Sequence, residues 1–103
     1  MSVLIGPYEF FGPYSSIAEL ADASGVFAVL HPAGEEEYEL ICLDHAENVK
    51  EAVAVTCADR RSPDPVLIAA CYMPGVSAAN RQKIAKQILD ELDDHEAEVH
   101  LLD

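Results

Sequence analysis

Apolar runs and a polar turn succeed one another between Ser24 and Val55, and this stretch predicts a compact unit of two strands and a helix. Val26–Leu30 is apolar throughout, which is typical of a strand that is buried on both faces. Pro32–Gly34 predicts a hairpin turn, because proline and glycine punctuate regular structure. Tyr38–Leu43 then predicts the antiparallel partner of the first strand.

A helix is expected directly after this hairpin, with its first residue at Asp44. Asp44 and Glu47 have the spacing of a capping box, in which each of the two side chains accepts a hydrogen bond from a free backbone amide. Val49 and Val53 then fall on one helical face, as residues that pack against a sheet do. We expect this helix to end near Thr56.

Apolar patterning predicts further elements on both sides of this unit. Val66–Met73 is the most hydrophobic run and predicts a central strand, and Ala78–Leu92 predicts a helix with an apolar residue every four positions. Val3–Ile5 and Glu98–Leu102 are short enough to be edge strands. Ser16–Ala23 predicts a short helix that begins with a capping box.

Two further features concern the N-terminal part. Tyr8–Tyr14 lies between Gly-Pro pairs, and its aromatic side chains are expected to cover one end of the core. Gly25 is expected to end the preceding helix, because glycine accepts the left-handed conformation at a helix C-terminus. The whole pattern predicts a single α+β (α/β-like) domain over residues 1–103, with a central, mainly antiparallel sheet of three to five strands flanked by helices.

Charge limits the classes of partner. The chain carries 19 acidic and 6 basic residues, a formal net charge of −13. Nucleic-acid binding draws its affinity from basic residues that neutralise phosphates, so DNA and RNA are not expected as partners. Strong negative charge instead favours basic protein partners.

Cysteine content and hydropathy predict a cytoplasmic protein. Cys42, Cys57 and Cys71 lie in apolar surroundings and are expected to be reduced thiols of a cytoplasmic protein. No apolar run has the length of a membrane span, and the N-terminus lacks the basic and apolar regions of a signal peptide. We expect no cofactor and no metal, since the Cys42–His45 spacing has no second ligand pair beside it.

Three segments of the chain resemble the GIY-YIG nuclease domain in order and pattern. They read SGVFAVL, YELICLDHAENVKEAV and RQKIAKQIL and extend over about residues 25–92. In that family a Gly-Ile-Tyr strand pairs with a Tyr-Ile-Gly strand, one helix supplies an arginine, and a later helix supplies a metal-binding glutamate. The resemblance implies a strand–strand–helix–strand–helix core and, in active members, metal-dependent cleavage of a phosphodiester.

The chemical groups of that family are substituted in this chain. The residues that match its motif positions are Gly25, Val26, Phe27, Cys42, Leu43, Asp44, Asn48, Ala52, Arg81 and Ala85. Phe27 occupies the position of a catalytic tyrosine of the family. Ala52 occupies the position of its arginine, and Ala85 that of its glutamate. Cleavage by the family mechanism needs a divalent metal and charge stabilisation of the phosphate. The resemblance therefore implies a degenerate, catalytically silent member.

We accordingly expect a non-catalytic protein-interaction or regulatory module that binds a protein partner or a second copy of itself. One alternative is a diverged metal-dependent nuclease that uses another residue set, such as Tyr38, Arg60, Arg61 or Arg81. Another is a small acidic inhibitor of a basic nucleic-acid-binding protein. The expected docking residues are the densest acidic stretches: Glu35, Glu36, Glu37, Asp90, Glu91, Asp93 and Asp94.

Overall fold

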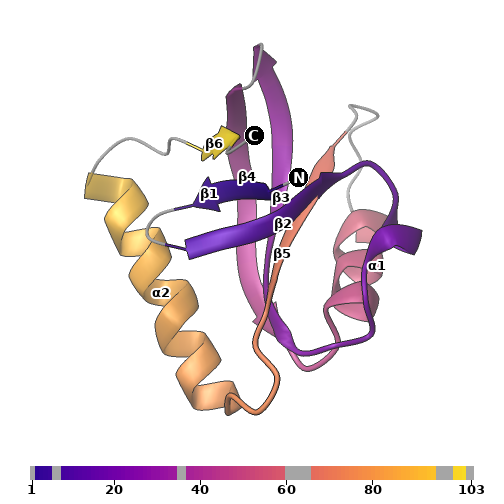
Figure 1. The fold of residues 1–103 in the computed structure, drawn as a ribbon, viewed down its shortest axis with the longest axis vertical. Helices are drawn as coiled ribbons and strands as arrows, with labels where there is room; N and C mark the ends of the chain where they lie inside the picture. Colours follow the sequence, from indigo (N-terminus) through magenta and orange to yellow (C-terminus); the bar gives the residue numbers. More distant parts are fainter. Residues whose placement is uncertain (1, 6–7, 35–36, 60–65, 95–98, 102–103) are drawn as a thin grey trace.

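Six strands curl into a closed antiparallel barrel with two helices packed on it (Figure 1). The computed structural model describes residues 2–5, 8–34, 37–59, 66–94 and 99–101. Five strands form the curled sheet, and the short β6 closes it between β4 and β1. The predicted α+β class with a mainly antiparallel sheet is confirmed. The strands are β1 (Ser2–Ile5), β2 (Tyr8–Tyr14), β3 (Gly25–Gly34), β4 (Glu37–Ala46), β5 (Leu67–Tyr72) and β6 (Val99–Leu101).

Strand β3 is the centre of the sheet, because it pairs with β4 on one side and β5 on the other. Its residues 25–30 are all buried, in agreement with the apolar run that predicted this strand. The predicted hairpin and the predicted central strand at Val66–Met73 are both confirmed, the latter as β5.

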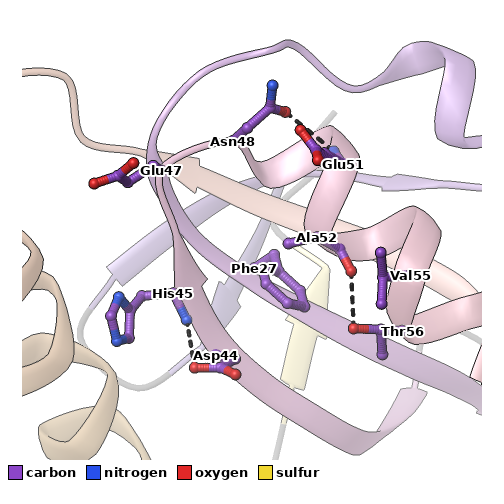
Figure 2. Close-up of a pocket in the computed structure, with 9 residues that line it drawn as sticks. All are labelled: Phe27, Asp44, His45, Glu47, Asn48, Glu51, Ala52, Val55 and Thr56. Atoms are coloured by element: carbon purple, nitrogen blue, oxygen red, sulfur yellow. Dashed lines mark hydrogen bonds between the residues drawn. The ribbon is translucent and has the colours of Figure 1, made fainter.

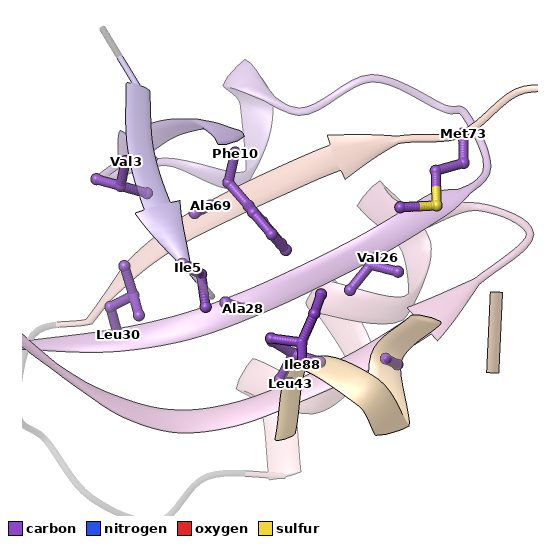
Figure 3. Close-up of a cluster of buried hydrophobic side chains, with 11 residues drawn as sticks. Val3, Ile5, Phe10, Val26, Ala28, Leu30, Leu43, Ala69, Met73 and Ile88 are labelled. Atoms are coloured by element: carbon purple, nitrogen blue, oxygen red, sulfur yellow. The ribbon is translucent and has the colours of Figure 1, made fainter. Parts of the chain in front are cut away.

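The barrel interior holds the larger hydrophobic cluster (Figure 3). Alternate residues of β3 point inward, among them Val26 and Ala28, where they join side chains of β1 and β2. Helix α2 (Ala78–Asp94) packs mainly against β4 and adds Ala85 and Ile88 to the same cluster. The predicted helix over Ala78–Leu92 is therefore confirmed, and its apolar face contributes to the barrel interior.

Helix α1 (Val49–Asp59) covers the outer face of β3, on the opposite side from α2 (Figure 1). Val49 and Val53 are fully buried there, as their spacing predicts. They pack with Phe27 and Val29, the β3 residues that alternate with the inward-facing ones. Phe27 therefore belongs to the layer beneath α1, whereas its neighbours Val26 and Ala28 belong to the barrel interior.

The predicted start of the first long helix is wrong. Asp44 is still part of β4, where it pairs with Phe27, and α1 begins at Val49. Asn48 caps the helix instead, because its side-chain oxygen accepts a hydrogen bond from the backbone N–H of Glu51 at 3.0 Å. Strand pairing thus extends through the segment that the capping-box spacing had assigned to a helix.

The N-terminal predictions also need correction. Tyr8–Tyr14, for which the sequence pattern predicts no strand, is the strand β2, and the expected helix over Ser16–Ala23 is a single 3₁₀ turn, η1 (Ile17–Glu19). Gly25 lies within β3 and has no left-handed backbone conformation. The two strands expected at edges, β1 and β6, each have two strand neighbours.

Two smaller findings complete the fold. Cys42, Cys57 and Cys71 are free and half-buried. Among the helices of the described residues, none has the length and apolarity required to span a membrane.

Candidate functional site

A hollow between β4 and α1 brings together residues of β3, β4 and the first two turns of α1 (Figure 2). We call it the acidic hollow. Its volume is about 470 Å³. Its lining residues are Phe27, Asp44, His45, Glu47, Asn48, Glu51, Ala52, Val55 and Thr56.

Strand register and helical spacing explain why these residues meet. Phe27 and Asp44 are direct partners in the β3–β4 pair, so both side chains lie on the face that carries α1. Asn48 caps that helix, and Ala52 follows one turn later. Since residues four apart lie one above the other on a helix, Asn48, Ala52 and Thr56 form one row along the hollow.

Hydrogen bonds hold this helical row in place. The side-chain amide of Asn48 donates to the carboxylate of Asp22 at 3.2 Å, which ties the start of α1 to the segment before β3. The Thr56 hydroxyl donates to the carbonyl of Ala52 at 2.9 Å (Figure 2). The backbone N–H of His45 donates to the Asp44 carboxylate at 2.8 Å. These bonds connect the start of α1 to the segment before β3 and orient the Asp44 carboxylate on β4.

The acidic hollow combines negative charge with an apolar surface. Asp44, Glu47 and Glu51 are exposed, and the lining residues that the structure describes include no lysine or arginine. Phe27, only 2% exposed, and the side chains of Ala52 and Val55 supply the apolar part. Such a surface suits lysine or arginine, whose long aliphatic stem packs on apolar groups while the charged end stays near carboxylates.

A second, smaller hollow lies on the other side of β4. We call it the α2 hollow, and its volume is about 280 Å³. Asp44 and His45 line both hollows, so the two meet at this point of β4. The residues lining the α2 hollow are Leu43, Asp44, His45, Gln82, Ala85, Lys86 and Leu89.

The family-motif positions are only partly brought together. Phe27, Asp44, Asn48 and Ala52 all line the acidic hollow. Ala85 does not join them, because it is 5% exposed and packs in the barrel interior with Val26 and Leu43. Gly25 lies in β3, and Cys42 packs at the margin of the outer cluster.

Arg81 is a buried cation near the start of α2. It is 5% exposed, and its guanidinium donates to the carbonyl of Val76 at 2.8 Å, across the turn before α2. Its Nε atom has no hydrogen-bond partner among the described residues. Of the other residues proposed for a diverged nuclease, Tyr38 packs beside the barrel interior, and Arg60 and Arg61 lie outside the described residues.

The acidic stretches predicted for docking are described only in part. Glu35 and Glu36 lie outside the described residues, and Glu37 is the first residue of β4. On α2, Asp90 is exposed and Glu91 half-buried, while Asp93 and Asp94 are its last two residues. Their role in docking stays a prediction.

Glu47, Glu51, Val55 and Thr56 belong to the acidic hollow but were not selected from the sequence. A usable signal was present, because Glu51, Val55 and Thr56 follow Asn48 at intervals of three, seven and eight residues, which place them on one helical face. Within the described residues, no group of three or more histidine, cysteine or carboxylate side chains is placed to hold a metal ion.

Comparison of the chain with family models, curated proteins and solved structures finds no match.

Proposed function

We propose that this protein is a non-catalytic protein-binding module on a GIY-YIG-like scaffold, and that its acidic hollow receives a lysine or arginine side chain of a protein partner. The observation that supports this proposal is the lining of the hollow, which among the described residues includes three carboxylates and an apolar surface but no lysine or arginine. Binding of this kind requires no cofactor.

The same lining argues against a phosphodiester substrate. A phosphate placed beside Asp44, Glu47 and Glu51 would meet like charge, and the net charge of −13 adds long-range repulsion. Phe27 and Ala52 line the hollow at positions where the family has a tyrosine and an arginine, so neither offers a phenol or a guanidinium. The chemistry of the hollow thus favours cations over phosphates.

The proposal is tested with the smallest ligand that represents it, arginine capped at both ends. Its control is the capped citrulline analogue, which keeps the shape and loses the charge. Titration into isotope-labelled protein, followed by amide NMR shifts, should show saturable changes at Phe27 and along 44–56 with arginine. Citrulline should bind at least about tenfold more weakly, because charge-assisted hydrogen bonds are lost.

Protein variants then test whether arginine binds in the acidic hollow. Neutralising the hollow with Asp44→Asn, Glu47→Gln and Glu51→Gln should abolish the arginine-specific shifts. The matched control changes three exposed carboxylates elsewhere, Glu9, Glu19 and Glu39, to glutamine, which alters net charge equally. Equal loss of binding in both triple variants would show a general charge effect and would contradict a specific site in the hollow.

A further inference from the structure

Among the described residues, strand β4 has a second strand neighbour over only part of its length. It pairs with β3 throughout, but on its other side it meets β6 only at Glu37 and Tyr38 among the described residues. From Glu39 to Ala46 no second strand neighbour is present in the part of the chain described. Ile41, at an irregularity in the β3–β4 register, is 43% exposed. An open strand edge is a template for pairing with another chain.

The hydrogen bonds at this edge show which backbone groups face outward. The N–H of His45 donates to the Asp44 side chain, so it is not committed to β3. In an antiparallel pair, backbone groups alternate between the two sides of a strand, so those of Leu43 face the same way as those of His45. The edge therefore presents the backbone N–H and C=O groups of Leu43 and His45. Of these groups, the His45 N–H is hydrogen-bonded to the Asp44 carboxylate.

The two hollows lie on opposite faces of the sheet at this same edge. The acidic hollow is on the α1 face with Asp44, and the α2 hollow is on the face of Leu43. Side chains of an added strand would alternate between the same two faces. A residue opposite Asp44 would enter the acidic hollow, and its two neighbours would enter the α2 hollow.

We infer that the β4 edge binds an extended basic segment of a partner protein by antiparallel strand addition. This inference rests on the proposed function and specifies the partner. A lysine or arginine stands opposite Asp44, and aliphatic residues stand opposite Leu43 and His45. Antiparallel pairing follows the sheet itself, in which every described strand pair is antiparallel.

Charge decides between the possible occupants of the edge. Pairing of β4 with a second copy of itself would bring two Asp44 side chains and their neighbouring carboxylates together, which destabilises a strand pair. A basic segment instead complements Asp44, Glu47 and Glu51. In the α2 hollow, Leu43, Ala85 and Leu89 favour an aliphatic side chain, and Lys86 disfavours a second cation.

The test uses the unmodified protein and the capped peptide Thr-Val-Arg-Val-Thr. N-methylation of both valines removes the peptide N–H groups that would face β4. N-methylation of the arginine and the last threonine is the matched control, because those N–H groups would face solvent. Binding measured by calorimetry should weaken by about tenfold or more with methylated valines and change little with the control. Equal affinity of the two methylated peptides would overturn strand addition.

Failure of this inference and failure of the proposed function give different results. If capped arginine binds and the two methylated peptides are equivalent, the hollow accepts a cation without strand pairing. If neither arginine nor any peptide binds, both proposals are wrong. If sedimentation of the protein alone shows a dimer that Ile41→Lys abolishes, the edge is occupied by a second copy and the basic-partner inference is overturned.

Discussion

Gly25 on β3 lies so close to the backbone of β5 that a Cβ atom at position 25 would overlap the carbonyl oxygen of Cys71. The same atom would lie 2.8 Å from the Cα of Tyr72, the residue that pairs with Gly25. Both neighbours are backbone, which cannot move aside as a flexible side chain can. Glycine is thus required here by close approach of two strands, not by an unusual backbone conformation.

Gly25→Ala should therefore be among the most destabilising single substitutions in the chain. We expect a loss of about 2 kcal/mol or more in the free energy of unfolding, because β3 and β5 must separate. Gly75→Ala is the control, since Gly75 has φ +81° but open space around it. Gly75→Ala should lower the free energy of unfolding by about 1 kcal/mol, through backbone strain alone. Urea unfolding measures the free energy of unfolding of both variants. A smaller loss of this free energy for Gly25→Ala than for Gly75→Ala would contradict the packing argument.

Long-range pairing explains why the start of α1 could not be predicted. Asp44–Glu47 and Asn48–Glu51 both have capping-box spacing, so local signals allow a helix to start at either. The choice is made by β3, which keeps pairing with β4 as far as Ala46. The central hairpin, β5 and α2 were predictable because each has a long, uniform pattern.

Strand β2 was missed because its Gly-Pro pairs are ordinary turn signals. Its inward residue Phe10 is fully buried, whereas Phe11 is 52% exposed, an alternation visible only once the segment is known to be a strand. For the site, the resemblance selected Phe27, Asp44 and Ala52. Helical spacing from Asn48 would also have selected Glu51, whereas Glu47 could be placed in the link between β4 and α1 only after the helix start was known.

Asn48 should contribute to stability through its cap. Asn48→Ala removes the acceptor for the Glu51 N–H and the donor to Asp22, and should lower the free energy of unfolding by about 1 kcal/mol. Asn48→Ser keeps an N-cap acceptor and should lose less than about 0.5 kcal/mol. Denaturant unfolding measures both, and equal losses would show that the cap is not what Asn48 provides.

Modification of the Cys42 and Cys71 thiols should require a higher pH in the folded protein than in the unfolded chain. Burial raises the pKa of the Cys42 and Cys71 thiols, and the Asp44 carboxylate raises that of Cys42 further. A raised pKa leaves less thiolate, the reactive form, at a given pH. Iodoacetamide should therefore modify both residues slowly near neutral pH, with rates that increase at higher pH than for the urea-unfolded chain.

Asp44→Asn separates the two causes. It removes the nearby negative charge and should speed modification of Cys42 at pH 8 while leaving Cys71 unchanged. Peptide mass spectrometry measures each site independently. Unchanged Cys42 kinetics in this variant would mean that burial alone sets its reactivity.

Arg81 should be replaceable by an apolar residue of similar length. Its Nε atom is buried and has no hydrogen-bond partner among the described residues, which costs desolvation free energy. Arg81→Met removes this cost but also removes the hydrogen bond to Val76. The free energy of unfolding of Arg81→Met should stay within about 1 kcal/mol of that of the parent. Arg81→Ala should lower it by about 2 kcal/mol or more, because it leaves a cavity. A large loss in both variants would show that the Val76 bond dominates.

The last prediction is that the protein does not cleave nucleic acid, even when family residues are restored in the acidic hollow. Phe27→Tyr and Ala52→Arg would place a phenol and a guanidinium there, but the glutamate position, Ala85, packs in the barrel interior on the other side of β3. A glutamate at position 85 would be buried rather than available to a metal. Neither the parent nor the double variant should cleave DNA or RNA with magnesium or manganese. Cleavage that depends on metal and copurifies with the parent protein would restore the diverged nuclease as the better account.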